Sequence, residues 1–321
     1  MVASRVATPT WSKRIRDTVA AAHIKSVGGP TNRNLGSSME RFGLRRAQRE
    51  RTTAVSDQNS DARSDQKSSR TVLGSILDSA LHEMNREPSG LFLSGLSAGL
   101  DIGFGPLMMA VVLTLSPGGY GDLGTELLLA SVYSVGFIFV ILGRSELFTE
   151  HTTLAVVPVL DRQASLGQLG RLWGLVYVGN LVGGVLFTLL AVLLTPGLGV
   201  VDPAAFETIA LKLVGHDLRW LFVGGVFAGW LMGLLAWLVT AAQETTGRLL
   251  LVVIVTGTIG MLHLPHSIAG NVEVLFGLLT SPAISVTDYL SFLALATVGN
   301  AVGGGIFVAA LKYEHVVRGA N

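Results

Sequence analysis

The chain has 321 residues, of which 50% are hydrophobic and only 14% are charged, and its formal net charge at pH 7 is +1. Soluble domains carry roughly a quarter of charged residues, so this composition indicates a membrane protein and argues against a soluble enzyme or a nucleic-acid-binding protein. The chain contains no cysteine, which excludes disulfides, thiolate metal sites and cysteine nucleophiles.

The first 70 residues form a basic, polar segment that holds 14 Lys and Arg against 6 Asp and Glu, including a cluster of arginines from Arg41 to Arg51. Such a segment cannot bury enough apolar surface to offset the entropy of ordering, so we predict that residues 1–70 are disordered. The basic charge would hold this tail near an anionic membrane surface. A targeting peptide is the alternative, because Arg- and Ser-rich, acid-poor segments have that composition.

Residues 71–88 show a helical pattern. Apolar residues recur at helical spacing opposite Asp78, His82 and Arg86. We therefore predict a short amphipathic helix that lies along the membrane interface. Its apolar residues are Val72, Ile76, Leu77, Ala80, Leu81 and Met84.

Long apolar stretches fill residues 89–315, and each is long enough to cross about 30 Å of hydrocarbon. They predict an all-α membrane protein with six transmembrane helices. The spans lie near 90–115, 126–160, 170–195, 219–241, 249–278 and 287–311.

The charges of the loops predict the orientation. Arg162, Arg171 and Arg248 lie in two loops on one side, and Lys312 and Arg318 follow the last span. The loops at the other ends of the spans are poor in Lys and Arg. Because positive loops stay inside, both termini are predicted to be cytoplasmic, which agrees with an even number of spans.

An internal repeat relates the two halves of the chain, about 89–195 and 219–311. Residues 178–187 and 298–307 share Val, Gly, Asn, Val, Gly, Gly and Phe at matching places. Glycines of the first span also recur in the fourth. Three spans per half predict an inverted repeat, with a shared pathway at the midplane where the halves meet.

The second and fifth predicted spans are each interrupted by polar residues. The second contains Arg144, Glu146, Glu150 and His151, which would be costly in contact with lipid. The sequence therefore predicts a break that lines a cavity, where irregular backbone is tolerated.

The fifth span breaks at Pro265, which disfavours helix just before it. Aligning Gly143 with Gly260 places Thr149 opposite His266, so the two breaks predict one central site. A hydrogen-bonded core histidine is the alternative for His266, and His263 is a second candidate.

Four groups of residues resemble one known family, the formate/nitrite transporters, in order over about residues 75–320. They are Gly143 to Thr149 in the second span; Trp173, Tyr177, Gly179 and Asn180 in the third; His266, Ser267, Ile268 and Ala269 in the fifth; and Gly299, Asn300, Gly303 and Gly304 in the sixth.

The resemblance implies an aquaporin-like pentamer in a bacterial inner membrane, in which each subunit has its own pore for a small monovalent weak-acid anion such as formate, nitrite or hydrosulfide. By the same resemblance, Leu147 and Phe148 form constrictions, and Thr149 and His266 meet between two hydrophobic slits. The pore and central residues would be His266, Thr149, Leu147, Phe148, His263 and Ser267, supported by Asn180, Asn300, Glu146, Glu150, Asp101 and Arg144.

A central histidine suits this transport. A bare anion pays a large desolvation penalty in an apolar constriction, whereas the neutral acid does not. Histidine titrates near physiological pH, so His266 could pass a proton to the anion or supply a transient positive charge. We expect no cofactor and no metal, since His263 and His266 have too few further ligands nearby in sequence.

Several residues depart from the family pattern. Pro265 precedes the central histidine where Glu is usual, Gly229 replaces an Asn before Trp230, and Glu150 and His151 follow Thr149. Asp101 and Arg144 are expected to be further buried charges, paired with one another. The chain therefore resembles a divergent branch, with its natural substrate left open.

Three alternative functions are compatible with a membrane protein of this composition. Gly95 to Gly99 fits the Gly-x-Ser-x-Gly pattern of a hydrolase, but that motif needs a strand before it and here lies in an apolar helix, so we expect no enzyme activity. An aquaporin-like channel for neutral solutes would carry paired Asn-Pro-Ala turns, which are absent. A membrane sensor or structural protein without transport is the third.

Overall fold

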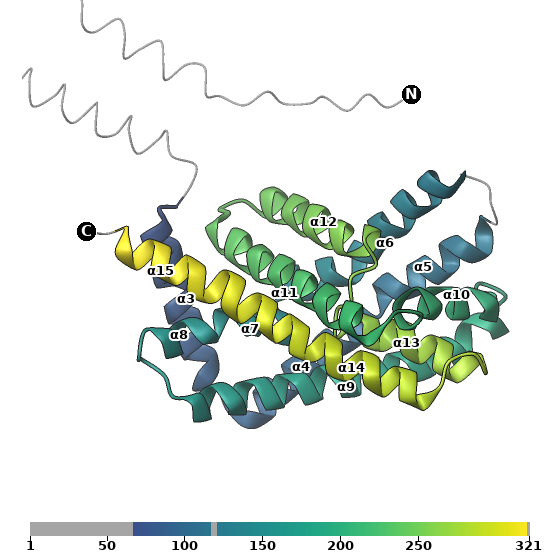
Figure 1. The fold of residues 1–321 in the computed structure, drawn as a ribbon, viewed down its shortest axis with the longest axis horizontal. Helices are drawn as coiled ribbons and strands as arrows, with labels where there is room; N and C mark the ends of the chain where they lie inside the picture. Colours follow the sequence, from purple (N-terminus) through teal and green to yellow (C-terminus); the bar gives the residue numbers. More distant parts are fainter. Residues whose placement is uncertain (1–66, 117–120, 320–321) are drawn as a thin grey trace, which may run out of the picture. The chain divides into compact units, whose positions relative to one another are not determined.

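The computed structural model describes residues 67–116 and 121–319, and within these ranges the ordered elements are helices, with no strand. Most of the basic tail predicted for residues 1–70 lies outside the described residues. Figure 1 shows the fold. The helices are α3 (Ser69–Met84), α4 (Pro88–Ile102), α5 (Phe104–Leu115), α6 (Gly121–Gly143), α7 (Phe148–Leu154), α8 (Val156–Leu160), α9 (Leu166–Gly197), α10 (Pro203–Val214), α11 (Leu218–Ala241), α12 (Thr245–Met261), α13 (Ala269–Thr280), α14 (Val286–Val302), the π-helix η1 (Gly303–Ala310) and α15 (Leu311–Arg318).

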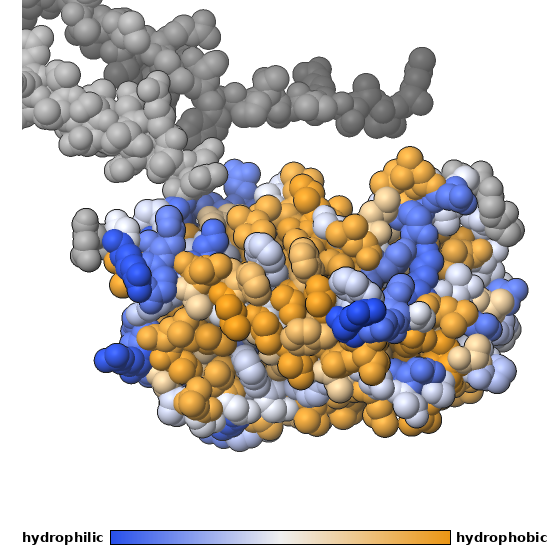
Figure 2. Space-filling model, viewed as in Figure 1, coloured by the Kyte–Doolittle hydropathy of each residue, from blue (hydrophilic) through white to orange (hydrophobic). Residues whose placement is uncertain are grey.

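Five of the described segments are long and apolar enough to cross a membrane, which makes this an integral membrane protein. They are α4 with α5, α6, α9, α11, and α14 with η1 and α15. Figure 2 shows apolar residues over much of one face of the molecule, with hydrophilic residues over α3 and α15 at the left and over α6 and α10 at the right.

The two interruptions predicted from the sequence are present. Helix α6 ends at Gly143 and α7 begins at Phe148, while α12 ends at Met261 and α13 begins at Ala269. The segments 144–147 and 262–268 between them are not regular helix. The first predicted span also divides at Gly103, between α4 and α5, which the sequence analysis did not predict.

Close helix contacts hold the spans together. Helix α4 packs along α9, and α11 packs along α14. A Cβ added to Gly99 on α4 would lie 2.1 Å from the carbonyl oxygen of Asn180, and one added to Gly229 on α11 would lie 2.2 Å from that of Asn300. Glycine is therefore required at both crossings, where two backbones touch.

Helix α3 covers part of the membrane domain. Ser68 caps its first turn by accepting from Thr71 N–H, and its polar residues Asp78 and His82 are exposed, as the amphipathic pattern predicts. Its buried side chains Val72 and Ile76 pack with Trp237 of α11 and with the C-terminal helices. The apolar face that we expected to meet the membrane interface is thus covered by protein.

Helix α10 was not recognised in the sequence. It lies in the connection at 196–218, begins with Pro203 after the cap residue Asp202, and buries Phe206, Ile209 and Leu213. Its main neighbour is α13, the second half of the interrupted fifth span. A helix of 12 residues is too short to span a membrane, so hydropathy alone does not reveal it.

The glycine crossing predicts a stability difference. Gly99→Ala should destabilise the fold by about 1–3 kcal/mol or more, because the added methyl overlaps backbone that cannot move aside. Gly174→Ala, also in a spanning helix but with nothing within 4 Å of the added Cβ, should be neutral or slightly stabilising. Melting temperatures of the detergent-purified variants check this, and equal losses in both would contradict it.

Candidate functional site

The first break is held by one asparagine. Asn180 on α9 is fully buried, and its Oδ1 accepts from Phe148 N–H at 2.8 Å. Its Nδ2 donates to the carbonyl oxygens of Gly95, at 2.8 Å, and Glu146, at 2.9 Å. One side chain therefore ties α4, α9 and the start of α7 together and satisfies backbone groups that the broken helix leaves open.

The second break is held in the same way by Asn300 on α14. Its Oδ1 accepts from Ser267 N–H at 2.8 Å, and its Nδ2 donates to the carbonyl oxygens of Gly225, at 2.8 Å, and Pro265, at 2.9 Å. The donors and acceptors correspond one for one with those of Asn180. The asparagines were predicted as supporting residues, but only the structure reveals these bonds.

Thr149 and His266, which the aligned breaks predict to be opposite one another, are in contact. Thr149 Oγ1 lies 2.9 Å from His266 Nε2, and both side chains are buried. His266 Nδ1 accepts from the backbone N–H groups of Ile268, at 3.3 Å, and Ala269, at 3.1 Å. Because Nδ1 is an acceptor, the proton of the neutral ring is on Nε2 and is donated to Thr149.

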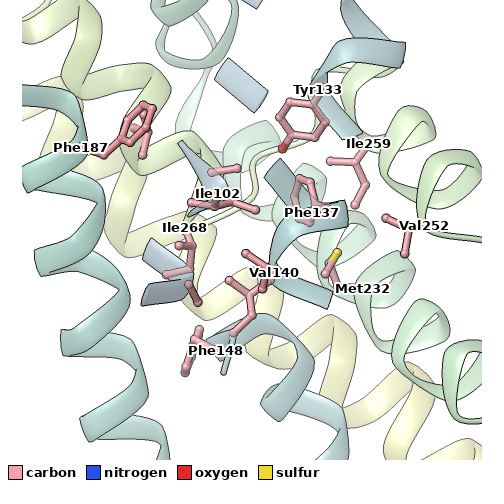
Figure 3. Packing of buried hydrophobic residues seen from close by; sticks show 14 of the residues in the cluster. Ile102, Tyr133, Phe137, Val140, Phe148, Phe187, Met232, Val252, Ile259 and Ile268 are labelled. Carbon is pink, nitrogen blue, oxygen red and sulfur yellow. The ribbon is translucent and has the colours of Figure 1, made fainter. Parts of the chain in front are cut away.

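Aromatic and aliphatic side chains surround this pair. Phe137 of α6, which the sequence analysis missed, meets the His266 ring edge to face with centroids 5.1 Å apart. Leu147 and Phe148 are buried, and Phe148 packs against Trp173 and Tyr177. Figure 3 shows Tyr133, Phe137 and Val140 along α6, with Phe148 beyond Val140. The sequence feature that points to Phe137 is its spacing of four residues from Tyr133, which places both rings on one face of α6.

Glu146 belongs to an ionic cluster beside α7. Its Oε1 lies 3.1 Å from Arg86, in the connection between α3 and α4, and its Oε2 contacts His151 Nε2. Arg86 also binds Glu83. Glu150, in the first turn of α7, is partly buried, and its carboxylate has no ion pair or hydrogen bond among the described residues. Glu146, predicted as a supporting residue, therefore links the connection after α3 to the first break through its contact with Arg86.

His263 does not join His266. Its backbone is in the left-handed region, with φ 46°, and its Nε2 lies 3.1 Å from Glu126 Oε2 of α6 and 3.4 Å from Lys212 Nζ of α10. Ser267 is buried beside the central histidine, and its Oγ has no hydrogen-bond partner among the described residues. The central site therefore contains Thr149, His266 and Ser267, with His263 in a separate cluster.

The predicted pairing of Asp101 with Arg144 is wrong. Arg144 is exposed in the first break, where its φ is 59°. Asp101 is partly buried and accepts from Ser97 Oγ, one turn earlier on α4, at 3.3 Å. Asp101 is satisfied within its own helix, and Arg144 points out of the packed interior, so neither needs the other as a counter-charge. Within the described ranges, no group of three or more His, Asp or Glu residues could hold a metal ion.

Comparisons with known proteins match most of the described chain. The sequence model of the family described as formate/nitrite transporter matches residues 70–314. The inner membrane protein YfdC of Escherichia coli is 29% identical over 238 residues, which are 74% of this chain and 74% of YfdC.

Two solved structures share the fold. An ion channel of the same transporter family, at 24% identity, has a TM-score of 0.65 and is matched over 76% of this chain and 98% of its own. A pentameric formate channel with formate bound, at 23% identity, has a TM-score of 0.60, with 72% and 98% covered.

The asparagine bonds predict what their loss does. Asn180→Ala should destabilise the fold by about 1–3 kcal/mol for each buried backbone group left unpaired. Asn180→Asp should cost at least as much, because its carboxylate still accepts from Phe148 N–H but its second oxygen would face the carbonyl oxygens of Gly95 and Glu146. The control is Asn85→Ala at the exposed end of α3. Equal melting temperatures for Asn180→Ala and this control would contradict the role of Asn180 in holding the first break.

Proposed function

Because the chain belongs to the formate/nitrite transporter family, we propose that it forms a transmembrane channel for small monovalent weak-acid anions, such as formate or nitrite. The observation that carries the proposal is the contact of Thr149 with His266 between two broken helices. Both groups are polar, buried and surrounded by apolar side chains, as expected for a selective point in an otherwise apolar pathway.

The architecture that we propose has six transmembrane spans in an inverted 3+3 repeat. In addition to the five long segments, α12 and α13, each too short to span alone, together form the fifth span in chain order. Support comes from the corresponding bonds of Asn180 and Asn300, which lie at matching places in the two halves. We infer from the loop charges that both termini are cytoplasmic, in a bacterial inner membrane.

The pore residues follow from this arrangement. Leu147 and Phe148 form one apolar constriction, Phe137 lines the other, and Thr149 and His266 lie between them. Ser267 contributes an unpaired hydroxyl beside the histidine. Asn180 and Asn300 support the pore by fixing both breaks rather than by touching the solute.

Transport is proposed to be linked to a proton, with His266 as the hydrogen-bond donor that the solute meets at the centre. An anion that enters an apolar constriction loses its hydration, and carrying a proton removes most of that cost. The Nε2–H of His266 is placed to donate to the solute at the centre, in exchange for its bond to Thr149. Because Nδ1 is occupied by two backbone donors, the resting ring is neutral and the proton has to reach the centre from elsewhere.

The remaining parts of the chain are proposed to serve this channel. Residues 1–70 would be a basic cytoplasmic tail, and residues 71–88 an amphipathic helix at the membrane surface. We infer a homopentamer, supported by the likeness to a pentameric formate channel. Large apolar side chains exposed on α9, including Leu190 and Leu193, are available for contact with lipid or with neighbouring subunits.

Flux measurements test the function. Purified protein in liposomes should carry formate and nitrite, faster when the entry side is acidic, because more of the anion is then protonated. His266→Ala should lower the flux by roughly tenfold, the loss expected for one hydrogen bond of about 1.4 kcal/mol. The control is His82→Ala on the exposed face of α3. Flux independent of pH and of His266 would instead indicate a neutral-solute channel.

Native mass spectrometry tests the assembly. We expect five copies of the chain in the detergent-released complex. A stable monomer or dimer that still conducts formate would contradict the proposed pentamer without affecting the pore inside each subunit.

A further inference from the structure

Glu273 is a buried acid that the proposed channel does not yet use. It lies on α13, seven residues after the central histidine, and only 6% of its surface is exposed. No hydrogen bond or ion pair to it is found among the described residues. It lines a small cavity together with Tyr133, His263 and Leu264. An ionisable side chain inside a membrane domain is costly, and such residues commonly mark the path of an ion or a proton.

The groups around Glu273 offer its carboxylate no free counter-charge. The nearest cation is Lys212 on α10, and its ammonium group already binds the carboxylate of Glu126. His263 lines the cavity and contacts the same Glu126. The other titratable groups on the helices packed against α13 are Glu207, Arg171, Tyr177, Asp288 and Tyr289, and Tyr133 lines the cavity. Arg171, the one further cation among them, binds the backbone carbonyls of Met84 and Arg86. None supplies a free positive charge, and an unpaired carboxylate would be costly in this cavity.

Neighbouring groups connect the cavity of Glu273 to an ionic cluster on one side and to the central site on the other. On one side, Lys212, Glu126 and His263 are each between a quarter and a third exposed, so the cluster lies at the surface of the subunit. On the other side, the cavity is shared with Tyr133, whose ring lies 5.2 Å from that of Phe137, which in turn meets His266. Figure 3 shows Tyr133 and Phe137 as neighbours along α6. Glu273 therefore lies between an accessible ionic cluster and the aromatic approach to the central site.

The central histidine as placed is a poor acid. Its Nδ1 accepts two backbone N–H groups, so its single ring proton is on Nε2. Release of that proton would leave an imidazolate anion, which is strongly unfavourable in an apolar site. A proton that accompanies the anion must come from another group before the constriction.

We propose that Glu273 is that proton donor. The Glu273 carboxyl gives its proton to an oxygen of the incoming carboxylate or nitrite anion, so one O–H bond breaks and one forms. The neutral acid proceeds past Phe137, and the carboxylate of Glu273 regains a proton from water at the cluster of Lys212, Glu126 and His263. This inference rests on the proposed function, and with cytoplasmic termini the cavity faces the external side.

The test uses full-length protein in liposomes, with formate uptake and internal acidification recorded together over a range of external pH. Glu273→Gln keeps the shape of the neutral acid but cannot release a proton, and formate uptake should fall by about tenfold or more. Glu273→Asp, which remains an acid, should restore much of the uptake. Asp122→Asn removes one exposed carboxylate from α6, the helix that carries Glu126, and should behave as wild type.

A second readout does not depend on transport. Infrared difference spectra at neutral pH should contain a carbonyl band of a protonated carboxylic acid that is absent in Glu273→Gln and present in Asp122→Asn. Wild-type uptake with an unchanged rate and pH profile in Glu273→Gln would overturn the inference and leave the channel standing. Wild-type protein that carries no formate or nitrite at any pH would overturn both.

Discussion

The rest of the structure depends on how two interrupted helices are held inside an apolar domain. Backbone groups freed by a break have no water to bind there, so each must find a partner in the protein. Asn180 and Asn300 provide these partners, and each binds one N–H and two carbonyl groups from different helices. Because each asparagine makes the same set of three bonds, both breaks are held in fixed positions. This brings Thr149 within hydrogen-bond distance of His266.

The same rigid arrangement sets the electrostatics of the centre. Two backbone N–H groups hold His266 in one tautomer and direct Nε2–H toward Thr149. The centre therefore offers a neutral hydrogen-bond donor rather than a fixed positive charge, which suits the proposed passage of a weak acid. The ion pairs lie away from it, between Glu146 and Arg86 beside the first break and between Lys212 and Glu126 near the second.

Much of the architecture could be predicted from hydropathy and from the internal repeat, including both breaks and the opposition of Thr149 and His266. Helix α10 was missed because a short helix between spans leaves no long apolar stretch. His263 was assigned to the centre because it is three residues from His266, yet the left-handed backbone at His263 turns its side chain toward Glu126. The pairing of Asp101 with Arg144 was predicted only because both are charged residues in apolar sequence. In the structure, Asp101 accepts from Ser97 and Arg144 is exposed.

The sequence by itself determined that this is a helical membrane protein of the formate/nitrite transporter type, with polar interruptions in its second and fifth spans. These features are local or repeat along the chain, so composition, spacing and self-similarity are enough to read them. Only the tertiary structure decided which polar groups meet: Asn180 with the first break, Phe137 with His266, and Glu273 with the cavity at Tyr133. Those contacts depend on the rotation and depth of packed helices, and residue spacing along one chain does not encode how separate helices turn toward each other.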